Sequence, residues 1–126
     1  MNVEPLDFAL ARETTQLRHL RTTLRDWLDR GGVNGNDRDE IMLAAHEAVA
    51  NGIEHSDGDG ELRVQGELDD HGVTVIVTSP GPWREPMTRF GRGNGLVLIR
   101  AMTEAEIDAT VTSVKVRLSR RLSTAR

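Results

Sequence analysis

The spacing of apolar residues changes once along this chain, and that change limits the folds it can adopt. From residue 11 to residue 55 apolar side chains recur every three or four positions, which is the period of an amphipathic helix. From Glu61 onward they alternate with polar neighbours, which is the period of a half-buried strand. Helices followed by strands predict an α+β domain: a two-layer α/β sandwich with a mixed, mostly antiparallel sheet and its helices on one face.

The boundaries of the predicted elements follow from residues that begin or end helices. Gly31 and Gly32 are expected to end the first helix, because glycine readily adopts the left-handed conformation found after helices. Asp37 is expected to cap the second helix, with Glu40 three residues later completing a variant of the capping box. The predicted elements are a strand at 6–10, helices at 11–29 and 37–55, strands at 61–68 and 73–78, a loop at 79–94, a short helix at 95–103, and strands at 106–109 and 111–122.

Composition excludes several classes of function. The length of 126 residues predicts a single domain spanning residues 1–126. The net charge of −4 argues against direct binding of nucleic acid, since binding to a phosphate backbone favours a basic chain. Cysteine is absent, so the chain can form neither a disulfide nor a thiolate metal site. No apolar run approaches the roughly 20 residues that cross a bilayer, so no membrane association is expected and a cytoplasmic location is the default.

The second predicted helix has an apolar face and a polar flank beside it. At about 100° per residue, the face toward the sheet comprises Ile41, Ala45, Ala48, Val49 and Gly52. The polar flank comprises Glu47, Asn51, Glu54 and His55. The carboxylate of Glu47 and the amide of Asn51, four positions apart, offer oxygens that suit Mg²⁺ and a carboxylate for proton transfer. An ordinary solvated helix face has the same pattern, so the spacing alone does not decide between the two.

Three glycines precede the predicted short helix at alternate positions, Gly91, Gly93 and Gly95. Glycines let the backbone approach a ligand closely, and a helix N-terminus offers free amides to phosphate groups. A flexible turn is the alternative interpretation. A dinucleotide-binding fold does not fit, because its glycine motif follows the first strand of a strand–helix–strand unit.

These two segments together resemble the motifs of a known ATPase superfamily. Residues 47–51, Glu-Ala-Val-Ala-Asn, with Glu54 and His55 after them, resemble the N-box of the Bergerat-fold ATPases, also called GHKL or histidine-kinase-type ATPases. Residues 91–102, GRGNGLVLIRAM, resemble the second glycine box of these proteins. Over nearly the whole chain, the order of elements is most similar to the RsbW-like anti-sigma-factor serine/threonine kinases.

The resemblance implies a kinase that uses ATP and Mg²⁺ and regulates transcription through proteins. Kinases of this family phosphorylate a serine of an anti-anti-sigma factor and sequester a sigma factor through a surface that includes the first helix; a homodimer is compatible with the resemblance. Carried over to this chain, Glu47 would be the general base and Asn51 the Mg²⁺ ligand. The residues implied in cofactor binding are Asn51, His55, Ser79, Gly81, Gly91, Arg92, Gly93, Asn94, Gly95 and Leu96.

The residues after the most apolar predicted strand depart from the family pattern. The family has Asp-x-Gly-x-Gly at this place, and its Asp accepts a hydrogen bond from the adenine amino group. This chain has Ser79 in place of the Asp and Trp83 in place of the second Gly. A hydroxyl is a neutral acceptor, and charge-assisted hydrogen bonds are roughly twice as strong as neutral ones. Two functions therefore stay open: an active Mg²⁺-ATP-dependent kinase, and a catalytically degenerate domain of the same fold that acts only as a protein-binding regulatory module.

Overall fold

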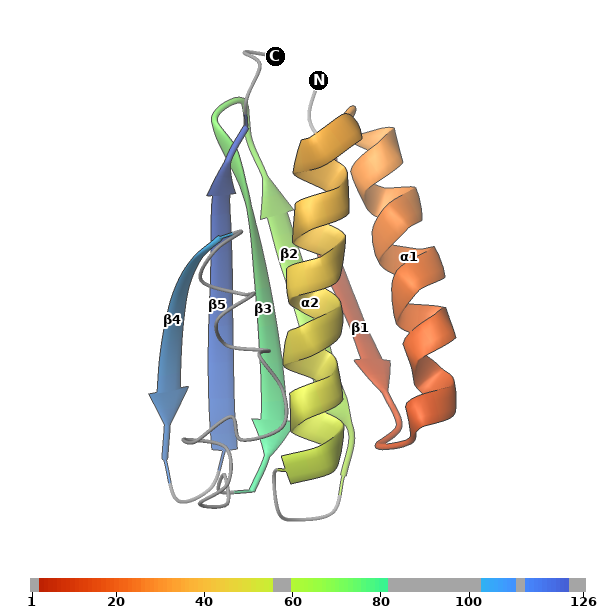
Figure 1. Cartoon of the computed structure of the whole chain (residues 1–126), viewed down its shortest axis with the longest axis vertical. Coiled ribbons are helices and arrows are strands. Elements are labelled where there is room, and N and C mark those ends of the chain that lie inside the picture. Colours follow the sequence, from red (N-terminus) through yellow and green to blue (C-terminus); the bar gives the residue numbers. More distant parts are fainter. Residues whose placement is uncertain (1–2, 56–59, 82–102, 111–112, 123–126) are drawn as a thin grey trace.

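The described residues form two α-helices and a five-stranded sheet in two layers (Figure 1). The structure, a computed structural model, describes residues 3–55, 60–81, 103–110 and 113–122, except for the side chain of His55. The elements in chain order are β1 (Leu6–Leu10), a 3-10 turn (Thr14–Gln16), α1 (Leu17–Arg30), α2 (Gly35–His55), β2 (Leu62–Leu68), β3 (Gly72–Pro80), β4 (Glu104–Ala109) and β5 (Ser113–Arg121).

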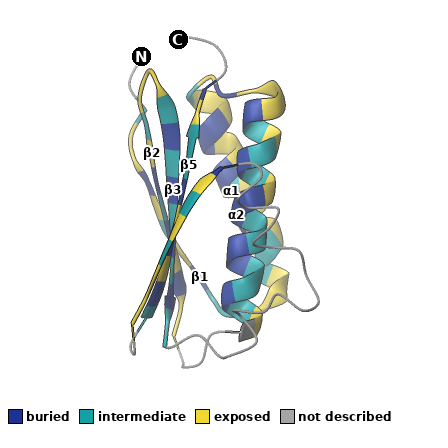
Figure 2. Ribbon diagram, turned by 60° about the vertical axis from the view of Figure 1, so that its left-hand side comes forward, coloured by how far each residue is buried: buried dark blue, intermediate teal, exposed yellow. Residues whose placement is uncertain are grey.

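The sheet has the strand order β1-β2-β3-β5-β4, and both helices cover the same face of it (Figures 1 and 2). Every pairing between the described strands is antiparallel. The predicted two-layer sandwich with helices on one face is therefore confirmed, and its mostly antiparallel sheet is antiparallel throughout the described residues. None of the helices described here is long and apolar enough to cross a membrane.

The core lies between the helices and the inner face of the sheet, where Figure 2 shows the buried positions of both layers facing each other. In β3 the valines alternate with half-buried residues, as the period of two predicts. Register places Val77 beside Val64 and Val116, so the central strand contributes to one continuous apolar surface. Residues from the helices that close the core are Leu20, Leu24, Trp27, Leu28, Ile41, Ala44, Ala45, Ala48 and Val49.

Trp27 is the largest fully buried side chain of the core, and β2 makes room for it with a glycine. A Cβ atom on Gly66 would lie 2.9 Å from Trp27 Cη2. The indole Nε1 donates a hydrogen bond to the Glu4 carbonyl at 2.8 Å, which satisfies the one polar atom of the ring. This packing places α1 over β1 and β2.

The helix boundaries differ from the predicted ones. The first predicted helix is divided into the 3-10 turn and α1, which ends where Gly32 adopts the left-handed φ of 77°. The predicted start of the second helix at Asp37 is wrong, because α2 begins at Gly35 and Asp37 lies in its first turn. The Asp37 carboxylate instead accepts a hydrogen bond from Arg120 Nε of β5 at 3.0 Å, a partner 83 positions away that no local pattern reveals.

The later boundaries also shift by a few residues. Ser79 and Pro80, predicted to begin a loop, belong to β3, because the pairing of β3 with β5 continues as far as Pro80 opposite Ser113. The strand predicted at 106–109 begins earlier, at Glu104, and the strand predicted at 111–122 is β5. The rest of the predicted loop from residue 82, and the short helix predicted at 95–103 apart from Thr103, lie outside the described residues.

Candidate functional site

The C-terminal half of α2 and the end of β3 meet at one corner of the sandwich. Their contact is close because α2 has a glycine there: a Cβ atom on Gly52 would overlap Ser79 Oγ and lie 2.8 Å from Leu62 Cδ2. Ser79 is 3% exposed and points from β3 toward the helix layer. The structure thus brings Ser79 against the residue that follows Asn51, which joins two segments that the sequence analysis treated separately.

Arg12 holds this corner together by hydrogen bonds, a role that no sequence pattern predicts. Its Nη1 donates to the Gly52 carbonyl and its Nη2 donates to the Pro80 carbonyl, each at 3.1 Å. The Gly52 carbonyl belongs to the last turn of α2, where carbonyl groups have no partner within the helix and a cation is favourable. One guanidinium therefore links the connection after β1 to the end of α2 and the end of β3. The sequence gives no signal for this role, because the two acceptors are 40 and 68 positions away.

The two polar residues singled out on α2 lie beside its buried face, as predicted. Glu47 and Asn51 are both half-buried, whereas their neighbours Ala48 and Gly52 are buried. The Glu47 side chain is 27% exposed, and its Oε2 lies 3.7 Å from His46 Nδ1. Glu54, one turn further, is exposed, and α2 ends at His55, whose side chain lies outside the described part. A carboxylate and an amide thus line the same flank of α2, next to the corner with Ser79.

After β3 the chain turns at Gly81, where the φ of 84° is in the left-handed region that favours glycine. Glycine at this position therefore allows the chain to turn directly after the strand. Gly81 follows Pro80, whose carbonyl Arg12 binds, so the turn starts from a fixed point.

The remaining residues predicted to bind the cofactor lie outside the described residues. These are Gly91, Arg92, Gly93, Asn94, Gly95 and Leu96, and the same holds for Trp83. Within the described ranges no cluster of three or more His, Asp or Glu side chains is suited to hold a metal. A Mg²⁺ ion bound with a nucleotide needs only one or two protein oxygens, because phosphates and water complete its octahedron. The half-buried amide of Asn51 therefore suits a Mg²⁺ ion that is bound together with a nucleotide, and not a metal site built from protein ligands alone.

A model of the histidine kinase-like ATPase domain matches residues 10–120. The chain belongs to this family. The match begins near the end of β1 and continues almost to the end of β5, so the ATPase domain includes the corner formed by α2 and β3. Membership implies nucleotide binding and confirms the resemblance to the GHKL ATPases.

Three solved structures are similar in fold to this chain over 91% or more of its length. The RsbU and RsbW domains of Rv1364c from Mycobacterium tuberculosis match with a TM-score of 0.81 and 27% identity over 98% of this chain and 34% of that chain. The SiaB-SiaC complex from Pseudomonas aeruginosa matches with a TM-score of 0.69 and 13% identity, over 91% and 88% of the two chains. The histidine kinase AdeS of Acinetobacter baumannii matches with a TM-score of 0.57 and 12% identity, over 98% and 70%. The last two similarities show the fold alone, and the present chain spans about a third of the Mycobacterium chain.

Proposed function

We propose that this ATPase domain is a Mg²⁺-ATP-dependent serine/threonine protein kinase that phosphorylates an anti-anti-sigma factor and sequesters a sigma factor. Family membership over residues 10–120 supports nucleotide binding, and the likeness to a structure that contains an RsbW domain supports the anti-sigma role. Sigma factors act in the cytoplasm, so the proposal includes a cytoplasmic location. The observation that carries the proposal is the corner where Gly52 lets Ser79 approach the flank of α2 that bears Glu47 and Asn51.

Each residue of the corner has a proposed role. Mg²⁺-ATP would supply the phosphoryl group, and the Asn51 amide oxygen would hold the metal ion. Glu47 takes the hydroxyl proton of the substrate serine while the serine oxygen forms a bond to the γ-phosphorus. ADP leaves as the bond from the γ-phosphorus to the oxygen that bridges it to the β-phosphate breaks. Ser79 accepts the hydrogen bond of the adenine amino group, and the segment from Gly91 to Leu96 binds the phosphates. Because Glu47 is half-buried beside the core and not in it, we expect its substitution to leave the fold stable.

A second candidate function is a protein-binding regulatory module of the same fold that no longer catalyses transfer. The observation that favours it is Ser79, a neutral side chain that is only 3% exposed where related proteins carry a carboxylate. A weaker hydrogen bond to adenine lowers nucleotide affinity, and about 1.4 kcal/mol corresponds to a tenfold change. Such a module would still bind its protein partners and would no longer transfer phosphate.

The test compares Glu47→Gln with Glu54→Gln, a matched change on the same helix at an exposed position. We expect Glu47→Gln to reduce phosphate transfer to a cognate anti-anti-sigma factor by about 10²- to 10⁴-fold, the usual contribution of a general base. Thermal melts and ADP affinity are expected to stay at parent values, and Glu54→Gln is expected to keep full transfer. Transfer that is equal in both variants would remove Glu47 from the mechanism. No binding of ATP by the parent, with or without Mg²⁺, would favour the module.

A further inference from the structure

Arg12 lies in the connection between β1 and the 3-10 turn, and its side chain reaches the corner formed by α2 and β3. It is half-buried there, and its Nη1 and Nη2 donate to the carbonyls of Gly52 and Pro80, each at 3.1 Å. Gly52 follows Asn51 along α2, and Pro80 follows Ser79 along β3. One side chain therefore binds the backbone next to the proposed metal ligand and next to the proposed adenine acceptor.

Both segments lack some hydrogen bonds of their own at this corner. The Gly52 carbonyl belongs to the last turn of α2, where carbonyl groups have no partner within the helix. Pro80 pairs with Ser113 of β5 but has no amide hydrogen to donate to that strand. Ends of helices and strands open more readily than their centres. The hydrogen bonds from Arg12 therefore restrain two ends that the regular pairing of the fold leaves weak.

The guanidinium group of Arg12 acts as a rigid spacer between these two ends. Its donors lie in one plane at fixed angles, so the two carbonyls cannot move apart without the loss of a hydrogen bond. Gly52 is also in close contact with Ser79, because an added Cβ atom would overlap Ser79 Oγ. This contact keeps the two ends from moving closer together. The separation of Asn51 from Ser79 is thus restrained in both directions.

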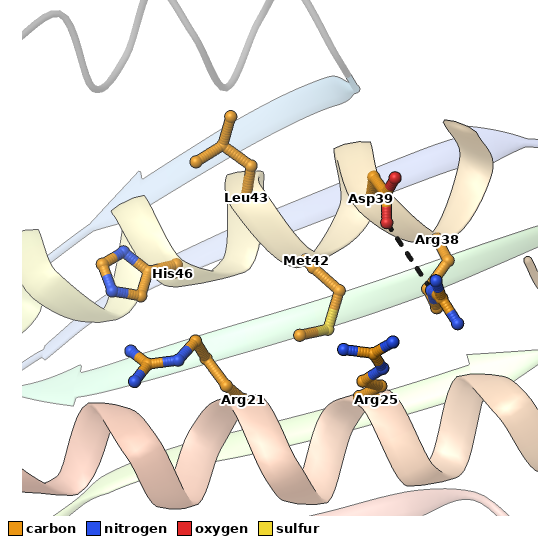
Figure 3. Close-up of a pocket in the computed structure, with 7 residues that line it drawn as sticks. All are labelled: Arg21, Arg25, Arg38, Asp39, Met42, Leu43 and His46. Atoms are coloured by element: carbon orange, nitrogen blue, oxygen red, sulfur yellow. Dashed lines mark ion pairs between the residues drawn. The ribbon is translucent and has the colours of Figure 1, made fainter. Parts of the chain in front are cut away.

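Other arginines near α2 lie on the outer surface of the helix layer. Figure 3 shows a groove between α1 and α2, and the residues drawn along it include Arg21, Arg25, Arg38 and Met42. Arg38 pairs there with the exposed carboxylate of Asp39, and ion pairs at the surface contribute little because water screens them. Arg12 differs from these residues because it binds main-chain carbonyls where α2 meets the sheet.

We propose that Arg12 is a positioning residue of the nucleotide site, and that its guanidinium keeps Asn51 and Ser79 at the separation that one Mg²⁺-nucleotide requires. Arg12 acts through the backbone at Gly52 and Pro80 and not through contact with the reacting atoms. A displacement of about 1 Å is enough to impair a site of this kind, because its hydrogen bonds and metal contacts are short. The proposal rests on the proposed function for the place of the nucleotide, and nucleotide binding rather than phosphate transfer tests it.

The experiment measures the affinity of the full-length chain for ADP with Mg²⁺ by calorimetry, and the stability of each variant by unfolding in urea. Arg12→Ala is expected to weaken ADP by about tenfold or more. Arg120→Ala is the matched control, because Arg120 also holds α2 to a distant element, through Asp37 near the start of the helix. It removes the same charge and lowers stability, but is expected to keep the ADP affinity within about twofold of the parent. Arg38→Ala removes the same charge from the outer surface and is expected to stay within the same limit.

Arg12→Lys separates the geometry of the side chain from its charge. Lysine keeps the positive charge, but its ammonium group has no planar fork with which to hold two carbonyls at a fixed separation. We expect Arg12→Lys to bind ADP at least about threefold more weakly than the parent. If Arg12→Ala does not fold by circular dichroism, Arg12→Gln replaces it, because the glutamine amide can donate to one of the two carbonyls.

Three results would overturn the proposal. Parent-like ADP affinity in Arg12→Ala, or in the glutamine variant, would show that the site does not depend on this side chain. An equal loss of affinity in Arg120→Ala would show that any loosening of α2 has the same effect. Full affinity in Arg12→Lys would show that a positive charge is sufficient. Phosphate transfer is measured separately: its absence in a parent that binds ADP contradicts the kinase role, and a parent that binds no ADP contradicts both proposals.

Discussion

Substituting Gly52 by alanine tests the close contact at the corner of the sandwich. The added Cβ atom would overlap Ser79 Oγ and lie 2.8 Å from Leu62 Cδ2. Both neighbours are buried, Ser79 at 3% and Leu62 at 0% exposure, so neither can move into solvent. Either the Ser79 hydroxyl adopts another rotamer and Leu62 shifts, or α2 moves away from β3.

Two opposing terms set the size of the effect. Inserting a methyl group into a packed site costs about 1 to 3 kcal/mol. Alanine is favoured over glycine inside a helix by up to about 1 kcal/mol, and Gly52 in the last turn of α2 receives only part of that gain. We therefore expect Gly52→Ala to lower the free energy of unfolding by about 1 to 2 kcal/mol, which corresponds to a fall of about 3 to 10 °C in Tm for a chain of this size.

A double-mutant cycle with Ser79→Ala identifies the cause. Ser79→Ala removes the hydroxyl that collides with the new Cβ atom and leaves the Ser79 Cβ position, 3.5 Å away, in ordinary contact. The double variant is expected to regain about 1 kcal/mol relative to the sum of the single variants. Ala50→Gly, at a half-buried position of the same helix, measures the helix-propensity term separately.

Unfolding in urea is monitored by the far-ultraviolet circular dichroism of the helices. Linear extrapolation of the free energy of unfolding to zero urea gives the differences between variants. If Gly52→Ala is at least as stable as the parent and shows no coupling to Ser79→Ala, then α2 and β3 are not in close contact at this corner. The geometry on which the proposed nucleotide site depends would then be wrong.

Three further predictions concern the start of α2, the β2–β3 turn and the adenine position. Arg120→Ala removes the cation that binds the Asp37 carboxylate, whose side chain is only 11% exposed. We expect this change to lower the free energy of unfolding by about 2 kcal/mol. A change below about 0.5 kcal/mol would show that this ion pair does not hold α2 to β5. The backbone amides of His71 and Gly72 donate hydrogen bonds to the Asp69 carboxylate and lower its pKa. The ionised carboxylate therefore stabilises the folded state above the pKa of about 4 that it has in the unfolded chain, and this stabilisation is lost as pH falls through the lowered pKa of the folded state. The urea midpoint of Asp69→Asn is thus expected to be lower than that of the parent at neutral pH and equal to it in acid. A difference in midpoint that does not change with pH would contradict this cause. Ser79→Asp is expected to tighten ATP and ADP by about fivefold or more in calorimetric titrations and to leave GTP unchanged, whereas equal gains for all three nucleotides would show that this position does not face adenine.

The helix α2 is held at both ends by arginines from distant parts of the chain. Arg120 of β5 binds Asp37 and Glu40 near its start, and Arg12 binds the Gly52 carbonyl near its end. A guanidinium can satisfy two acceptors at once because its donors form a rigid fork. The proposed catalytic flank of α2 is therefore positioned by side chains that take no part in the reaction.

Much of the fold follows from the sequence, because it depends on local spacing. The alternation of Val73, Val75 and Val77 predicts a strand with one buried face, and the stripe from Ile41 to Val49 predicts the face of α2 that packs on it. The polar flank with Glu47 and Asn51 follows from the same helical period. The roles of these residues stay predictions, as do those of the segment from Gly91 to Leu96.

The contacts between distant segments needed the tertiary structure. Arg120 binds Asp37 near the start of α2 and Arg12 binds the Gly52 carbonyl near its end, and these partners are 83 and 40 positions apart, which leaves no periodic signal. The proximity of Ser79 to Gly52 and the groove formed by Arg21, Arg25 and Met42 likewise exist only once α1, α2 and β3 are packed together. A sequence pattern records which face of an element is buried, because that depends on the period of the element itself. Which residues meet across two faces depends on the register and the packing angle, and these are determined by the core as a whole.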